Sequence, residues 1–116
     1  MHELPVMQSI LTVVLKHAAM HGVKKIHAIN LSVGEMSDLE EEWMQKYFDH
    51  LSKGSLAEGS KLRIEWIKAV LSCESCLKRF EIDRKRLDGI TCPSCGQNKF
   101  TLVSGKEYHI KNMEAE

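Results

Sequence analysis

Four cysteines, arranged as two identical pairs, are the residues whose spacing points most directly to chemistry. Each pair encloses two residues, and fifteen residues separate the pairs; the thiols are Cys73, Cys76, Cys92 and Cys95. Two thiolates of one short turn can reach a single ion, and two such turns complete a tetrahedron around Zn(II), with Zn–S bonds of about 2.3 Å. Because four sulfurs leave no open position for a substrate, we expect the zinc to be structural.

Two other uses of paired cysteines fit this pattern less well. A thioredoxin-like redox site has a single pair at the start of a helix, whereas here two pairs flank a polar, turn-rich segment. The alternative function is that of a zinc-ribbon nucleic-acid-binding or adaptor protein, because five basic residues lie between the pairs: Lys78, Arg79, Arg84, Lys85 and Arg86. Acidic residues nearly cancel their charge: Glu74, Glu81, Asp83 and Asp88. The salt-dependent attraction to phosphates would therefore be weak.

The second residue of the chain is a histidine, His2, and Glu3 follows it. A free terminal amine, the main-chain nitrogen of His2 and its imidazole can close fused chelate rings on one ion, and the main-chain nitrogen of Glu3 can join them. A flat, all-nitrogen arrangement of this kind suits Ni(II) or Cu(II) and suits zinc or magnesium poorly. The N-terminus is therefore the candidate site for an exchangeable metal.

Two more histidines, His17 and His21, lie four residues apart in a segment that is predicted to be helical. That spacing places both imidazoles on one face of a helix, where they could chelate a metal. The simpler interpretation is that cationic or polar residues suit the C-terminal end of a helix. The other three histidines, His27, His50 and His109, stand alone in the sequence.

The first part of the chain is predicted to form a helix and then a strand. Pro5 suits a first helical turn, and before Gly22 apolar residues recur at three- and four-residue spacing: Met7, Ile10, Leu11, Val14 and Ala18. From Ile26 the period changes to two, since Ile29, Leu31 and Val33 alternate with Asn30 and Ser32, and Gly34 ends the segment. This change of period predicts a strand with one buried face.

A second helix and further strands follow. Ser37 and Glu40 resemble a capping box at the start of a helix. Apolar residues then recur every four positions, on one face of that helix: Leu39, Trp43, Tyr47 and Leu51. Leu62, Ile64 and Trp66 alternate with Arg63 and Glu65, which predicts a second strand that runs to about Leu71. Beyond the cysteines, alternating pairs predict a third strand, or a hairpin bulged at Gly105; they are Phe100 with Leu102 and Tyr108 with Ile110.

These elements predict an α/β fold in which two helices lie on a small mixed three-stranded sheet. The cysteine segment has few large apolar residues and needs a metal to hold it together. We therefore expect an inserted zinc-ribbon-like four-cysteine domain before the last strand. The predicted ranges are 1–71 plus 100–116 for the α/β domain and 72–99 for the zinc-binding domain.

Composition excludes several classes of protein. Over 116 residues, 16 Lys and Arg balance 16 Asp and Glu, so no basic field is available to attract nucleic acid or a membrane surface. No apolar run is long enough to span a membrane and no signal peptide is recognisable, so we expect a cytoplasmic protein whose thiols stay reduced. A Ser-His-Asp arrangement, a phosphate loop and an HExxH motif are all missing from the sequence, and we do not expect an enzyme.

Together these features resemble the HypA/HybF family, the hydrogenase maturation nickel metallochaperones. The resemblance covers essentially the whole chain: it includes the N-terminal MHE, the order of helices and strands, the GSLAEGSKL segment and the paired cysteines. The sequence Val33-Gly34-Glu35 at the end of the first strand also belongs to it. Many family members follow MHE with an aromatic residue or methionine and then serine, where this chain has Leu4 and Pro5.

The resemblance implies functions for particular residues. His2 would be the essential nickel ligand, helped by neighbouring main-chain nitrogens, with Glu3 as a candidate further ligand and Asp38 or Glu40 as an acidic residue near the metal. Structural zinc would be held by Cys73, Cys76, Cys92 and Cys95. The nickel would pass to the large subunit precursor of [NiFe] hydrogenase, with a GTPase of the HypB type as partner. We expect no nucleic-acid or membrane partner, and a monomer or a weak homodimer.

Overall fold

The computed structural model describes residues 2–83 and 89–116. Met1, with its terminal amine, lies outside the described residues, as do four charged residues considered for nucleic-acid binding: Arg84, Lys85, Arg86 and Asp88. The chain forms two compact units. Unit 1 is Met1–Ser32, Asp38–Glu65 and His109–Glu116, and unit 2 is Val33–Ser37 and Trp66–Tyr108. In the part of the chain that the structure describes, neither helix has the length and apolar character needed to cross a membrane.

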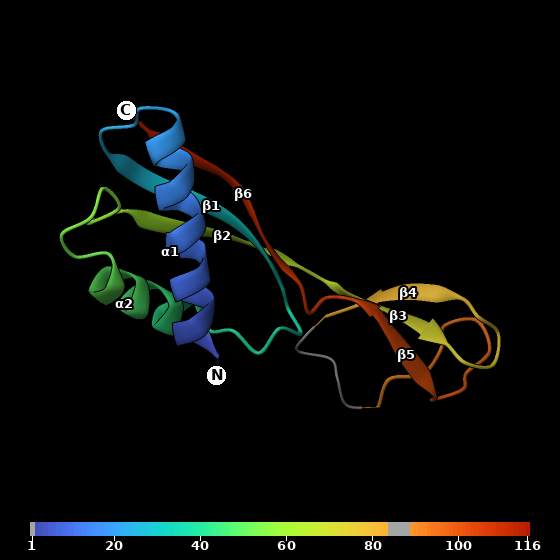
Figure 1. Ribbon diagram of the computed structural model, residues 1–116. Coiled ribbons are helices and arrows are strands. Elements are labelled where there is room, and N and C mark those ends of the chain that lie inside the picture. The colour runs from blue at the N-terminus through green and yellow to red at the C-terminus, as the bar shows by residue number, and fades with distance from the viewer. Residues whose placement is uncertain (1, 84–88) are drawn as a thin grey trace. The chain divides into compact units, whose positions relative to one another are not determined.

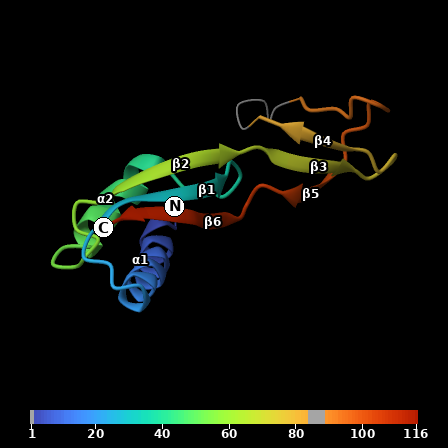
Figure 2. The ribbon, with the colours of Figure 1, turned by 90° about the horizontal axis from the view of Figure 1, so that it is seen from above.

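Two helices and a three-stranded sheet make up unit 1 (Figures 1 and 2). In chain order the elements are α1 (Glu3–Met20), β1 (Ile26–Gly34), α2 (Glu41–Leu51), β2 (Lys61–Ile67) and β6 (Tyr108–Ala115). The strands lie in the order β2-β1-β6, with β1 in the middle. The largest fully buried side chains come from both helices and β1: Phe48, Met7, Ile10, Ile26, Ile29, Leu31 and Met44. The predicted α/β arrangement of two helices on a small three-stranded sheet is confirmed.

The first helix and the first strand follow the predicted pattern. α1 buries the residues whose spacing predicts it: Met7, Ile10, Val14 and Ala18. Gly22, just after the end of α1, has φ +64°, a left-handed conformation that glycine adopts without steric cost. β1 then begins at Ile26 and ends at Gly34, as predicted.

The start of α2 differs from the predicted one. Glu40 is the N-cap residue and makes no side-chain cap hydrogen bond, so the prediction of a capping box is wrong. The backbone N–H of Ser37 donates to the carbonyl of Gly34 over 3.1 Å, which places Ser37 in the turn after β1. The helix begins only at Glu41, too far along the chain for Ser37 to cap it.

The buried face of α2 also differs from the predicted one. Met44 and Phe48 are fully buried, whereas Trp43 is 43% exposed and stacks on Tyr47 with ring centroids 5.8 Å apart. Both pairs follow the same four-residue step along the helix. Sequence spacing therefore does not decide which of the two apolar stripes faces the core.

A second three-stranded sheet lies in unit 2. Its strands, in the order β4-β3-β5, are β3 (Ala69–Cys73), β4 (Arg79–Ile82) and β5 (Phe100–Ser104). β3 pairs antiparallel with both neighbours and places Leu71 opposite Phe80 on one side and Leu102 on the other. The rings of Phe80 and Phe100 meet edge to face at 5.3 Å. The buried core of this unit is small: Ala69, Leu71 and Ile82.

On either side of the cysteines, consecutive strands belong to different sheets, and the sequence pattern does not show this division. One strand is predicted from Leu62 to about Leu71, but β2 ends at Ile67 and β3 begins at Ala69 in the other sheet. The strand or hairpin predicted beyond the cysteines is likewise divided into β5 and β6, on either side of Gly105. Residues 66–71 and 100–108, which the predicted ranges assign to the α/β domain, lie in unit 2; they include the paired strands β3 and β5 and the adjoining ends of β2 and β6.

Two glycines allow three segments of unit 2 to approach one another closely. The N–H of Gly34 donates to the carbonyl of Glu107, and the N–H of Met36 donates to the carbonyl of Gly105, both over 2.8 Å. A Cβ at Gly34 would overlap the carbonyl group of Gly105, and a Cβ at Gly105 would lie 2.7 Å from the Cα of Ala69. Gly105 also has φ +123°. Larger residues are therefore disfavoured at both positions.

Candidate metal centres

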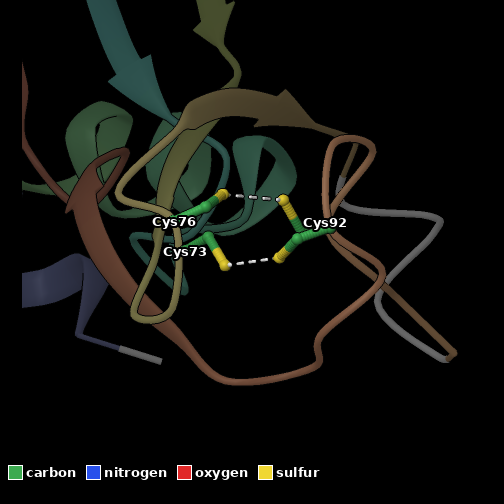
Figure 3. Close-up of side chains that lie close together, drawn as sticks. Cys73, Cys76 and Cys92 are labelled. Atoms are coloured by element: carbon green, nitrogen blue, oxygen red, sulfur yellow. Dashed lines mark hydrogen bonds between the residues drawn. The ribbon is translucent and has the colours of Figure 1, made fainter.

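The four cysteine side chains converge in unit 2 (Figure 3). Their Sγ atoms all lie within 4.8 Å of one another. The Sγ atoms of Cys73 and Cys95 are 3.5 Å apart, and those of Cys76 and Cys92 are also 3.5 Å apart. Four sulfurs bound to one Zn(II) at about 2.3 Å stand about 3.8 Å from each other in a tetrahedron. The cluster therefore fits this ion with only small adjustments.

Two backbone turns of the same form present these sulfurs. In the first turn the N–H of Leu77 donates to the carbonyl of Cys73, and in the second the N–H of Gly96 donates to the carbonyl of Cys92, both over 2.9 Å. Leu77 has φ +63° and Gly96 has φ +74°, so both are left-handed. Glycine adopts this conformation freely, whereas for leucine it costs about 1–2 kcal/mol. The sequence therefore signals the second turn through Gly96 and gives no such signal at Leu77.

The pKa values of the thiols show that the cluster favours a mixture of charged and neutral sulfurs. A hydrogen bond from the backbone N–H of Cys95 lowers the pKa of Cys92 to about 6, although burial opposes it. A hydrogen bond from the backbone N–H of Gln97 lowers the pKa of Cys95, but burial and the neighbouring sulfurs outweigh it and raise the value to about 12. Four thiolates this close together require a cation to balance their charge.

At the N-terminus, α1 begins immediately after His2. His2 is the N-cap residue of α1, and its exposed side chain makes no cap hydrogen bond. Its carbonyl accepts a hydrogen bond from the N–H of Val6 over 3.4 Å. The N–H groups of His2 and Glu3 lie at the very start of the helix, where backbone donors have no partner within it. The two adjacent main-chain nitrogens therefore take no part in the backbone-to-backbone hydrogen bonds of α1.

Glu3 makes a structural contact that the sequence analysis misses. Its side chain is only 6% exposed, and Oε2 accepts a hydrogen bond from the N–H of Glu40 over 3.1 Å. Since Glu40 is the N-cap of α2, a carboxylate from α1 satisfies a backbone donor at the start of α2 and complements its dipole. Burial raises the pKa of the Glu3 carboxyl, but hydrogen bonds, including those from the N–H groups of Glu3 and Glu40, outweigh it and leave the pKa below its ordinary value.

The Glu3→Ala variant should unfold more easily than the parent protein. We expect a loss of roughly 1–2 kcal/mol in the free energy of unfolding, because a charged hydrogen bond at a helix N-terminus disappears. The folded-state pKa of Glu3 is lowered, so the carboxylate stabilises the fold above the pKa of the unfolded chain, and this contribution disappears as pH falls through the folded pKa.

Urea denaturation at neutral pH and in acid below a pH of about 3 measures this difference. The stability gap between the parent and Glu3→Ala should narrow in acid, while the exposed Glu58→Ala control stays close to the parent at both values. An equal gap at both pH values would contradict the role of the carboxylate.

The other acidic residues considered for the nickel site are placed differently. Asp38 and Glu40 are both exposed, and Asp38 has φ +64° in the connection before α2. Within residues 2–83 and 89–116, one set of three or more metal-binding side chains lies close enough to share an ion, and it is the four cysteines. Among the described residues, His2 therefore has no pair of neighbouring side chains with which to share an ion.

The fold and the cysteine cluster define a class of small α/β proteins in which a four-cysteine module is inserted in the sequence between two strands of the main sheet, β2 and β6. A family model described as "Hydrogenase/urease nickel incorporation, metallochaperone, hypA" matches residues 1–115. The chain therefore belongs to the HypA family of nickel incorporation metallochaperones, which act in hydrogenase maturation.

Individual relatives match over nearly their whole length. The hydrogenase maturation factor HypA of Methanococcus aeolicus is 33% identical over 116 residues, which cover 97% of this chain and 94% of the relative. That of a Geobacter species is 34% identical, with all of both chains covered. The solution structure of the Ni metallochaperone HypA from Helicobacter pylori matches with a TM-score of 0.67 at 25% identity, over 99% of this chain and 97% of that chain. The predicted family resemblance is confirmed.

Proposed function

We propose that the chain binds Ni(II) at its N-terminus through His2 and delivers it for insertion into the large subunit precursor of [NiFe] hydrogenase. The observation that carries this proposal is the position of His2 as the exposed N-cap residue of α1. Its imidazole and the main-chain nitrogens of His2 and Glu3 can bind nickel without breaking an i to i−4 backbone hydrogen bond of the helix; the Glu3 N–H would give up its hydrogen bond to the Glu3 carboxylate. A site of this kind can be both loaded and emptied without disturbing the core.

The helix itself favours this mode of binding. A main-chain nitrogen has to lose its proton before it binds nickel, and the anion that results is stabilised by the partial positive charge at a helix N-terminus. The Glu3 carboxylate contributes in a second way, because its hydrogen bond to the N–H of Glu40 fixes the first turn of α1 against the start of α2. Glu3 would then position the nitrogens, and its carboxylate stays a candidate ligand.

We propose that the four-cysteine cluster holds Zn(II) as a structural ion. The donor set supports this, because four thiolates in a tetrahedron leave no open position and bind zinc in preference to harder cations. Nickel in transit has to be exchanged, and a closed site with two buried sulfurs, Cys73 and Cys92, is poorly suited to that. The two metals would therefore occupy separate sites with different functions.

Membership of the HypA family supports a proposal for the partners. We propose that a GTPase of the HypB type and the hydrogenase large subunit precursor receive or pass on the nickel, and that the chain is a carrier without catalytic activity. Reduced thiols are needed to bind zinc, which fits a protein that works in the cytoplasm. Delivery to urease, which the family description also mentions, is tested by the same kind of experiment.

Transfer of nickel between purified proteins tests the delivery step. The nickel-loaded chain is mixed with nickel-free large subunit precursor and an excess of glutathione, with or without the GTPase, and the nickel on the precursor is measured after separation by size. We expect more nickel on the precursor than when the same amount of nickel is added as the free ion with glutathione. Equal amounts from both sources would overturn the delivery function.

A further inference from the structure

Two imidazoles lie side by side near the end of α1. The rings of His17 and His21 are nearly parallel, with an interplanar angle of 13° and centroids 6.0 Å apart. Both residues are exposed, and His21 is the C-cap residue of α1. A separation of four residues places them one turn apart on the same face of the helix.

Neither ring is held by another group among the residues that the structure describes. Each imidazole has its stacking contact with the other one, and the backbone N–H of His21 donates to the carbonyls of His17 and Ala18 as part of the helix end. His27, by contrast, pairs with the Glu116 carboxylate over 3.3 Å. Binding an ion at His17 and His21 would therefore cost the stacking contact between these two rings and no contact with a third side chain among the described residues.

The geometry allows both rings to bind one ion. Two nitrogens bound to the same metal at about 2.1 Å each stand at most about 4.2 Å apart. Exposed rings with centroids 6.0 Å apart can bring one nitrogen each to that separation by side-chain rotation. The carbonyl groups at a helix C-terminus carry partial negative charge, which favours a cation there. Lys111 shares a groove with His17, but its ammonium group is bound by the Glu65 carboxylate at 2.6 Å.

We propose that His17 and His21 form a second, exchangeable site for a borderline divalent ion such as Ni(II), at the opposite end of α1 from His2. Two neutral imidazoles select nickel, copper or zinc over calcium and magnesium. Fifteen residues of helix separate His2 from His17, a distance of about 22 Å, so one ion cannot bridge them. The chain would therefore bind two nickel ions at once, one at each end of the helix.

The two sites would differ in chemistry. At His2, main-chain nitrogens and an imidazole give a flat site whose nickel exchanges slowly. At His17 and His21, two imidazoles and water molecules give an open, six-coordinate site that binds weakly and exchanges quickly. Six-coordinate Ni(II) is paramagnetic and broadens the NMR signals of the imidazoles that bind it. NMR therefore shows directly which histidines hold the ion.

The experiment is a nickel titration of zinc-loaded, untagged protein in the His2→Ala background, followed by calorimetry and by NMR of the histidine ring nitrogens. This background removes the proposed N-terminal site, so the result does not depend on it. We expect one weak nickel ion per chain and selective broadening of the His17 and His21 rings. Since losing a ligand costs at least as much as losing its outer-shell partner, adding His21→Ala should weaken this binding by at least about tenfold.

Two matched variants complete the test. The pair His21→Ala and Ala19→His keeps the number of histidines but moves one imidazole off the shared face, and it should lose as much affinity as His21→Ala alone. The single exposed histidine of α2, changed as His50→Ala, should have no effect. Nickel binding that survives in the moved variant, or broadening that falls on His50 or His109 or on no ring, would overturn the proposal. A parent protein that binds as much nickel as His2→Ala would instead count against the N-terminal site.

Discussion

The His2→Ala variant should lose its tightly bound nickel and keep both its zinc and its fold. The His2 imidazole is the proposed side-chain ligand that closes a chelate ring with the main-chain nitrogen of His2. Without the imidazole this ring cannot form. We expect the affinity for nickel to fall by roughly 100-fold or more. The fold should be unaffected, because the exposed His2 side chain makes no cap hydrogen bond to α1.

Equilibrium dialysis of untagged protein with metal analysis measures the effect, and thermal unfolding checks the fold. A competitor that holds free nickel in the submicromolar range keeps the weaker His17 and His21 site empty, so that tight binding alone is counted. His50→Ala is the matched control, since it removes an exposed imidazole from a helix of the same unit. Equal nickel binding by His2→Ala and the parent would contradict the proposed nickel site.

Local parts of the fold and of the metal sites could be predicted from the sequence, because their signals lie within a few residues. The period of α1 and the alternation in β1 are of this kind, and so are the two cysteine pairs, whose sulfurs meet as expected. Each pair carries its own turn, so its spacing encodes the geometry directly. The closing of the four-sulfur cluster then needs only that two turns face each other.

Long-range choices could not be predicted in the same way. Alternation marks Leu62, Ile64 and Trp66, and an apolar run follows Lys68, but neither feature shows that β2 and β3 join different sheets. Alternation reports which face of a strand is buried and carries no information on its hydrogen-bonded neighbours. The hydrogen bond from the N–H of Glu40 to the Glu3 carboxylate joins residues 37 positions apart. The local pattern at Ser37 and Glu40 predicts a different cap for α2, so the sequence gives no sign of this contact.

Removing the zinc should unfold the cysteine-containing unit. Its core is small: Ala69, Leu71 and Ile82 are buried, and five partly buried apolar side chains pack against them, namely Met36, Phe80, Ile90, Phe100 and Leu102. Burial of this extent stabilises the unit by on the order of 10 kcal/mol, which is less than the cost of ordering the chain. Structural zinc contributes about 10–16 kcal/mol in small zinc domains at neutral pH. The left-handed Leu77 and the four crowded sulfurs destabilise the metal-free unit, so we expect it to fold only when the ion is bound.

Hydrogen exchange with and without a strong chelator, under reducing conditions, measures this effect residue by residue. The amides of Leu77 and Gly96, which donate to cysteine carbonyls in the two turns, should lose their protection when zinc is removed. Amides of α1 and α2 should keep theirs, because these helices pack into the separate core of unit 1 around Met7 and Phe48.

The Cys92→Ser variant should reproduce the effect of the chelator, since a serine oxygen is a much poorer zinc ligand than a thiolate. Ser94→Ala is the matched control in the same turn: Ser94 contacts the Cys92 sulfur through its backbone N–H at 3.4 Å, which alanine retains. Full protection of both turns in Cys92→Ser would show that the apolar contacts of this unit suffice without the ion. Loss confined to the two turns, with β3 and β4 still protected, would limit the role of zinc to the loops that bind it.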